Sequence, residues 1–371
     1  MNRRWWITSA LYSFGCLIAL AIVLTGVYAA PTEPHPDDTV VTTPDEVARY
    51  VTAHVPPQAS GAPALSIPTG LYITLAEFTG PYTVEVAGQL WQRYADSLPE
   101  DLSEGIFIPN AKDQPTFTEL YRERHNNEEL IGWSFRVTLR ETFDYSPYPM
   151  DRQQIRLRMW HPDFERNVFL TPDLSAYTST DPAALPGVDT GLVLEEWGLQ
   201  QAFFSYRAYV QNTDFGGPTY AEQQLHPELY YSLAVRRHLI TPMIERGITP
   251  VVALITLFVI VTMLSKDRER RENFGVTPGS VIIVGAALLF AVLISHNAMR
   301  DEVKAAGLLY MGYMYVITYL VILGVVVNAV LIVGWPDLKL FREHDNLYVR
   351  LMYWPVITST MLLATLLTFH D

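Results

Sequence analysis

The stretch FDYSPYPMDRQQIRLRMW, residues 143–160, joins a turn to a strand. Its first half places aromatic residues and prolines around Asp151. In its second half, Ile155, Leu157 and Met159 alternate with polar residues. Alternation with a period of two predicts a half-buried β-strand, and the prolines predict a turn before it. The stretch therefore predicts an acidic turn that leads into a strand of a sheet.

Similar strand-like runs recur between turn signals on both sides of this stretch. They lie at residues 70–78, 82–94, 134–143, 154–160, 200–210 and 228–237. Half-buried antiparallel strands at this spacing are typical of a β-sandwich, which we place at residues 65–238. Residues 30–64 are rich in proline, threonine and acidic residues, and we expect a flexible lead there with one short helix around residues 45–54.

The C-terminal third of the chain is far more apolar than a soluble domain requires. Four long apolar runs follow Leu239, at residues 247–264, 274–295, 307–335 and 347–369. Each reaches or exceeds the ~18 to 20 residues that cross a bilayer as a helix. We therefore expect a four-helix transmembrane domain at residues 239–371, and an α+β membrane protein as a whole.

The N-terminus carries a further apolar stretch. Arg3 and Arg4 precede a run of apolar residues that ends in small residues at Ala29. This pattern predicts a signal peptide over residues 1–29, with an uncleaved anchor helix as the alternative. The only cysteine, Cys16, lies inside this stretch, so the remainder of the chain forms no disulfide and no thiolate metal site.

Charge favours one topology and limits the partners. Basic residues cluster between the first two apolar runs and between the last two, which predicts that both linkers face the cytoplasm and that the sandwich and the C-terminus lie outside. A formal net charge of −13 argues against nucleic acid as a partner and favours cations near the exported surface.

Three segments together resemble the pentameric ligand-gated ion channels, particularly the prokaryotic members. YPMDRQ, residues 148–153, is similar to the family signature FP(F/M)DxQ. Residues 69–96 resemble the family's first two strands, with Tyr94-Ala95-Asp96 in the place of Trp-x-Asp, and residues 233–250 resemble the last strand and the start of the first membrane helix. The likeness covers residues 67–369 and implies a homopentamer in a bacterial inner membrane, in contact with membrane lipid. The loop-closing cysteines of animal members are absent here.

The resemblance implies a set of residues that couple the sandwich to the pore. Asp151 would meet Arg236 or Arg237, because a carboxylate and a guanidinium form short, charge-assisted hydrogen bonds. The alternative is an ordinary surface ion pair worth ~0 to 1 kcal/mol. The neighbouring contacts would come from Phe78, Thr79, Tyr148, Pro149 and Arg300.

The second apolar run, which begins near Gly275, is distinguished by small and polar residues. Residues of its two adjacent stripes at helical spacing are candidates to line a pore, and the register between the Leu288 and Leu289 faces stays open. The candidates are Thr277, Pro278, Val281, Ile282, Val284, Gly285, Leu288, Leu289, Val292, Ser295 and His296. Five copies would form a leucine ring that closes a pore by dewetting. The alternative is ordinary helix packing, in which glycine and alanine allow close approach.

In this family a ligand site lies between adjacent sandwiches and is walled by aromatic residues. The candidates here are Trp91, Arg93, Trp160, His161, Phe164, Tyr206, Tyr209, Phe215 and Tyr220. Aromatic faces suit a cationic amine at ~0.5 to 2 kcal/mol per contact, although each residue alone is more often core packing.

These patterns predict a subunit of a ligand-gated channel that conducts monovalent or divalent ions, with cations favoured by the acidic exported domain. Protons, divalent cations and small molecules all stay open as the gating stimulus. The alternative is a non-conducting, membrane-anchored sensor or interaction module. The sequence contains no nucleophile-elbow motif, no nucleotide-binding motif and no zinc-protease motif. We therefore expect that the protein is not an enzyme and uses no cofactor, and we assign no metal site.

Overall fold

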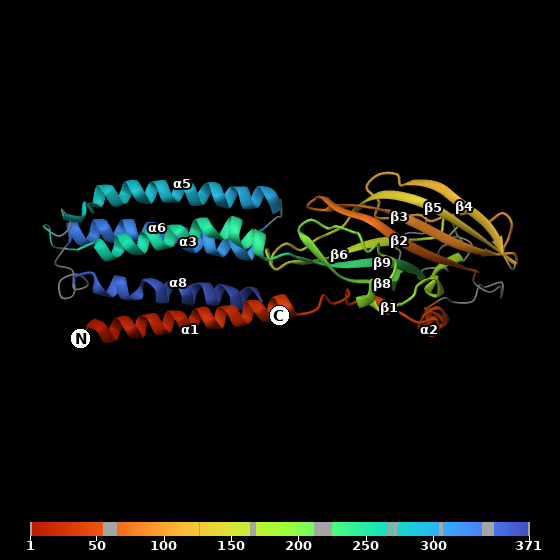
Figure 1. Cartoon of the computed structure of the whole chain (residues 1–371), viewed down its shortest axis with the longest axis horizontal. Helices are drawn as coiled ribbons and strands as arrows, with labels where there is room; N and C mark the ends of the chain where they lie inside the picture. Colours follow the sequence, from red (N-terminus) through yellow and green to blue (C-terminus); the bar gives the residue numbers. More distant parts are fainter. Residues whose placement is uncertain are drawn as a thin grey trace. The chain divides into compact units, whose positions relative to one another are not determined.

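The computed structural model describes residues 2–369, except for 55–64, 126, 164–167, 211–224, 266, 268, 270–272, 304–306 and 336–344. The chain divides into two compact units (Figure 1). One unit is the β domain, residues 32–143 and 152–237. The other is the helical domain, residues 1–31, 144–151 and 238–371, so the acidic turn groups with the helices.

The described part of the β domain contains nine strands. They are β1 (Thr39–Val41), β2 (Leu65–Gly80), β3 (Thr83–Ala95), β4 (Thr116–His125), β5 (Glu128–Arg140), β6 (Arg152–Met159), β7 (Val168–Pro172), β8 (Trp197–Val210) and β9 (Leu225–Arg237). One sheet has the order β1-β8-β9-β6, and the other has the order β4-β5-β3-β2-β7. All pairs are antiparallel except β2 with β7.

The core of the β domain follows from the alternation read in the sequence. On β6, Ile155, Leu157 and Met159 are buried, whereas the residues between them are partly exposed. A hydrogen bond links the two sheets, because the hydroxyl of Tyr206 on β8 donates to the carbonyl of Leu170 on β7 at 3.1 Å. The two-sheet β domain expected from the sequence is therefore confirmed.

All six strand-like runs of the sequence are strands in the structure, and three further strands were not predicted. On β4 a bulge between Glu119 and Tyr121 interrupts the alternation, and most of the strand is exposed. Four of the five residues of β7 are apolar and show no alternation, because the strand is almost entirely buried. The short helix of the lead is α2 (Pro44–His54), and β1 lies just before it and pairs with β8.

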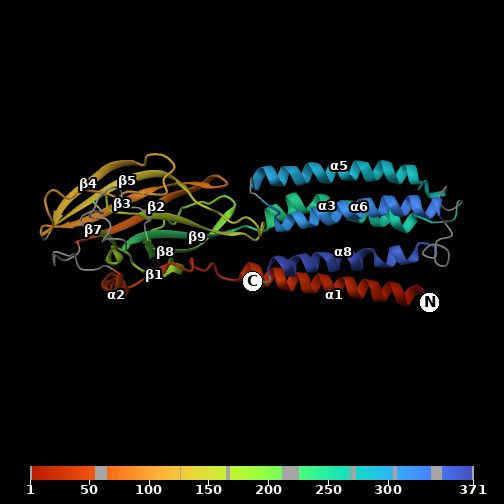
Figure 2. The same cartoon turned by 180° about the vertical axis from the view of Figure 1, so that it is seen from behind.

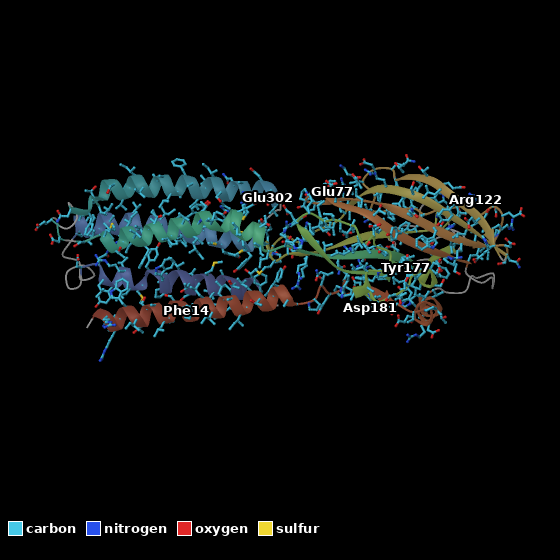
Figure 3. The ribbon with its side chains drawn as sticks, in the orientation of Figure 1. Phe14, Glu77, Arg122, Tyr177, Asp181 and Glu302 are labelled. Carbon is cyan, nitrogen blue, oxygen red and sulfur yellow. The ribbon has the colours of Figure 1, made fainter. Side chains whose placement is uncertain are left out.

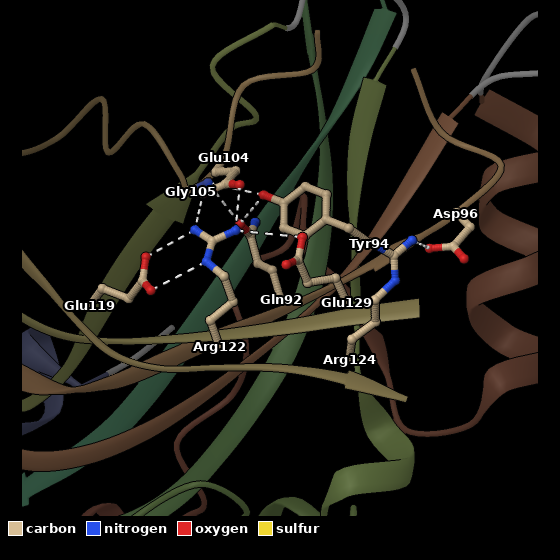
Figure 4. A network of polar contacts seen from close by, with 9 residues as sticks. All are labelled: Gln92, Tyr94, Asp96, Glu104, Gly105, Glu119, Arg122, Arg124 and Glu129. Carbon is tan, nitrogen blue, oxygen red and sulfur yellow. Dashed lines mark hydrogen bonds and ion pairs between the residues drawn. The ribbon is translucent and has the colours of Figure 1, made fainter. Parts of the chain in front are cut away.

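Ion pairs hold β4 at the edge of its sheet (Figure 4). Arg122 on β4 donates to both carboxylate oxygens of Glu104, at 2.9 and 2.7 Å, and to Glu119 at 2.9 Å. On the adjacent loop, the amide of Gly105 donates to Gln92 on β3 at 2.9 Å. Charged side chains on an edge strand also discourage pairing with another chain's strand.

The helical domain contains five apolar helices long enough to cross a membrane, judged by length and composition within the described residues. They are α1 (Asn2–Ala29), α3 (Ile240–Met263), α5 (Pro278–Val303), α6 (Tyr310–Gly334) and α8 (Leu347–Thr368). We expected four helices in this domain, and the described residues contain five, because α1 packs against α8 within the same unit. Helices α3, α5 and α6 contact one another, and α8 contacts α3 and α6.

Candidate functional site

A pocket of about 570 Å³ lies in the β domain beside the strands β2, β3, β4 and β5. Four aromatic side chains line it, those of Tyr72, Trp91, Tyr121 and Tyr177, together with Arg93. Tyr177 comes from the segment after β7 and is labelled in Figure 3. An aromatic pocket with a few polar groups is the usual form of a small-molecule site.

Glycines on neighbouring strands make room for two of these rings. Gly70 pairs with Trp91, and a Cβ at Gly70 would lie 2.2 Å from the indole. Gly132 pairs with Tyr121, and a Cβ there would lie 2.2 Å from that ring. The rings of Trp91 and Tyr121 therefore lie directly over the backbone of a glycine, and any larger residue at either glycine would displace them.

Asp173 holds one side of the pocket in place. Its Oδ2 accepts hydrogen bonds from the indole nitrogen of Trp91 at 3.0 Å and from Nε of Arg93 at 2.8 Å. Burial alone would raise the pKa of this carboxyl, but the bonds from Arg93, Trp91 and Ser175 outweigh it and lower the pKa below its usual value. Asp173 is therefore a fixed anion that orients two of the predicted ligand residues.

Carboxylates outnumber the one cation at this pocket. Arg93 also pairs with Glu128 at 2.9 Å, so two carboxylates share its guanidinium. On the other side, the hydroxyl of Tyr72 donates to Asp189 at 2.8 Å. These carboxylates lie around the pocket and not in its lining, where Arg93 is the charged residue. They offset the charge of Arg93, so the aromatic faces stay compatible with a cationic ligand.

The remaining ligand candidates lie elsewhere. Tyr206 is fully buried and stacks on Tyr50 at 4.7 Å between ring centroids, and His161 is 1% exposed. The rings of Trp160 and Phe107 are tilted against each other, with 5.8 Å between their centroids. Phe164, Phe215 and Tyr220 lie outside the described residues, and Tyr209 is described only as a residue of β8.

The sequence missed Tyr72, Tyr121 and Tyr177 as pocket residues. Tyr72 could have been found from its neighbour Gly70, because a glycine in a strand pattern marks close approach of another group. Tyr177 follows a buried strand in a long connection, and nothing in its local sequence indicates that it returns to β2. In the structure its hydroxyl bonds to the backbone of Leu71, donating to the carbonyl at 2.9 Å.

The acidic turn, residues 144–151, caps a membrane helix. The backbone amides of Tyr310 and Met311, at the start of α6, donate to the carbonyls of Ser146 and Tyr148 at 2.8 and 3.2 Å. No side chain caps this helix end, so the turn satisfies amides that would otherwise lack partners. Tyr148 and Asp151 are fully buried, and Pro149 is buried as well.

Two of the coupling candidates meet around Trp197 in the β domain. Phe78 stacks on Trp197 at 4.7 Å, and the guanidinium of Arg237 lies 4.2 Å from the centre of the same indole. Arg237 also pairs with Glu196. The indole therefore connects the end of the β2–β3 hairpin to the last residue of β9, three residues before α3 begins. Thr79 is exposed. Arg236 on β9 lies opposite Arg152 on β6 in the strand register.

The predicted pore residues of α5 fall on two different faces. Val281, Gly285 and Val292 are buried against other helices, and a Cβ at Gly285 would lie 2.8 Å from Val326 of α6. By contrast, Ile282 is 46% exposed and Leu289 is 42% exposed. Of the other predicted positions, Pro278, Val284 and Leu288 are partly exposed and Thr277 is exposed.

Polar side chains tie α5 to α6 near the end of α5. Ser295 bonds to the hydroxyl of Tyr315 at 2.9 Å, and His296 stacks on the same ring at 4.8 Å. Glu302, labelled in Figure 3, pairs with Arg246 of α3. The two predicted pore residues Ser295 and His296 thus contact α6, and Arg300 is exposed.

Within the part of the chain that the structure describes, no group of three or more histidine, cysteine or acidic side chains is arranged to hold a metal. Comparison with protein-family models and with curated protein sequences finds no match for the chain.

Proposed function

We propose that the chain is one subunit of a homopentameric, ligand-gated ion channel of a bacterial inner membrane. The observation that carries this proposal is the position of the acidic turn. Its flanking strands β5 and β6 belong to the β domain, yet its backbone carbonyls bond to the first amides of α6. A stimulus that moves these strands would pull on a membrane helix through this turn.

The exposed stripe of α5 supports a choice of pore face. Ile282, Ala286, Leu289 and Leu293 recur at helical spacing and are all exposed within the subunit. Five such stripes around an axis would form a tube with a ring of Leu289 at mid-height, which closes by dewetting. We therefore place Leu289 rather than Leu288 on the pore face. Gly285 and Val292, which the sequence grouped with Leu289, are buried together with Val281 and would hold α5 against its own subunit.

The aromatic pocket supports a small cationic amine as the stimulus. Trp91, Tyr72, Tyr121 and Tyr177 offer π faces, and Glu128 and Asp173 offset the charge of Arg93 from outside the lining. The ion pathway conducts cations, in keeping with the net charge of −13. The rival is a non-conducting sensor anchored in the membrane, which would use the same pocket without a pore.

Recording from the purified protein in planar bilayers tests this proposal. We expect unitary currents that are carried by cations and change in frequency when amines, protons or calcium ions are added. A monomer or dimer in detergent, together with no current under any of these conditions, would leave the sensor as the function.

A further inference from the structure

Helix α1 presents a face of small residues to α8. Ser9, Ser13, Cys16 and Ala19 follow one another at intervals of three or four residues, and these positions are buried or partly buried. The two helices lie side by side along their length in both views (Figures 1 and 2). Small residues at a helix interface allow close approach of the backbones, which is how helices associate in lipid.

Polar atoms join the two helices at three points of this face. The hydroxyl of Ser9 donates to the carbonyl of Leu351 at 2.6 Å, and the hydroxyls of Tyr12 and Ser359 bond at 3.0 Å. The Sγ of Cys16 lies 3.9 Å from the Oγ of Ser359. Hydroxyl groups of a spanning helix need such partners, because hydrocarbon offers none.

The other side of α1 carries large apolar residues. Leu11, Phe14 and Ile22 are each more than 60% exposed. This division into a small, polar contact face and a bulky apolar face suits a helix that stays between a protein and lipid. A signal peptide needs only a continuous apolar middle and has no use for a matched face.

We propose that α1 is retained as a fifth spanning helix that docks on α8, and that it is not removed as a signal peptide. Arg3 and Arg4 lie in its first turn, so the positive-inside rule places its start in the cytoplasm and its end outside. Five spans then leave the C-terminus outside, the same side that the charges of the linkers favour. The proposal does not depend on ion conduction.

The intact mass of the purified full-length protein gives the first test. We expect the mass to include residues 1–29. A mature chain that begins just after Ala29 would overturn the proposal, whatever the activity of the protein.

A disulfide gives the second test, because Cys16 is the only cysteine of the chain. With Ser359→Cys we expect rapid oxidation to an intramolecular disulfide, seen as a linked pair of peptides in non-reducing mass spectrometry. Leu363→Cys is the matched control, because Leu363 lies one turn further along α8 and is 57% exposed. Equal linkage from the two variants, or linkage from the control alone, would overturn docking through this face.

A bulky residue placed in the contact face of α1 tests whether disulfide formation depends on close packing of α1 against α8. In the Ser359→Cys background, Ser13→Leu should slow formation of the disulfide at least about threefold, whereas Phe14→Leu on the lipid face should leave the rate unchanged. An unchanged rate in both variants would contradict the packing described.

Discussion

Asp151 is buried at the end of the turn whose carbonyls cap α6. A buried carboxylate is tolerated only where it is hydrogen-bonded or paired. We infer that it holds the turn in the geometry that lets Ser146 and Tyr148 cap the helix. The residue lies far along the chain from α5, the helix that we propose lines an ion pathway.

Replacing Asp151 by Asn should therefore change gating and leave conductance unchanged. The amide keeps the shape but loses the charge, so the turn transmits motion less well and a stronger stimulus is needed for half-maximal current. Single-channel recording separates the two quantities. Altered conductance with normal gating would contradict this role for Asp151, and Asp144→Asn, at an exposed position of the same turn, is the control.

His161 predicts a pH dependence of stability. Burial lowers the pKa of its imidazole more than the nearby Asp163 raises it, and Nδ1 accepts a hydrogen bond from the amide of Asp163 at 3.0 Å. The unfolded chain binds a proton below about pH 6.5, whereas the folded chain resists protonation. The stability due to neutral His161 is therefore complete above that pH and is lost as the pH falls from about 6.5 towards the lowered pKa.

His161→Gln should reduce the loss of thermal stability between pH 7.5 and 5.5. Differential scanning calorimetry of the full-length protein in detergent measures the melting temperature at both pH values. His35→Gln is the control, because that side chain is 39% exposed and makes no comparable buried contact. The same pH slope in wild type and His161→Gln would show that another group carries the dependence.

The contact between the acidic turn and α6 is made by the backbone. Met311 is 3% exposed, and its amide donates to Tyr148. Proline in the first turn of a helix removes an amide while it keeps helical geometry. Met311→Pro and Met311→Ala both lose the methionine side chain, and the main difference between them is the backbone amide that proline lacks.

Met311→Pro should therefore require a stronger stimulus than Met311→Ala for half-maximal current. One hydrogen bond contributes about 0.5 to 1.5 kcal/mol, which corresponds to a shift of about two- to tenfold. Concentration–response curves in planar bilayers measure this shift. Coincident curves for the two variants would show that the cap is not part of gating.

The sequence predicted the elements of the β domain better than their contacts. Alternation at Ile155, Leu157 and Met159 identified β6 because one face of that strand is buried. The strand β4 was not predicted, because its bulge interrupts the alternation of polar and apolar residues. The contact of Tyr177 with β2 was not predicted either, because a long connection brings this residue back to the strand. On α5 the period of the small residues could not distinguish the pore face from the face that packs on α6. The structure shows only which face packs on α6: a Cβ at Gly285 would lie 2.8 Å from Val326, so Gly285 belongs to that face.

A homopentamer of chains of 42.0 kDa would have a mass of about 210 kDa. Each subunit would contribute one α5 to the wall of the pathway. The exposed apolar positions of α5 are unfavourable in water, but they suit either a neighbouring subunit, lipid or a narrow pore that wets only when it opens.

A single cysteine on α5 tests whether Leu289 lines an ion pathway. In a Cys16→Ala background, Leu289→Cys places the only thiol of the chain at the proposed constriction. We predict unitary currents in planar bilayers that a water-soluble thiol reagent blocks irreversibly. Phe290→Cys, one position along the helix and 66% exposed, should conduct and stay unaffected. The absence of unitary current, or equal block of both variants, would contradict a pore lined by Leu289.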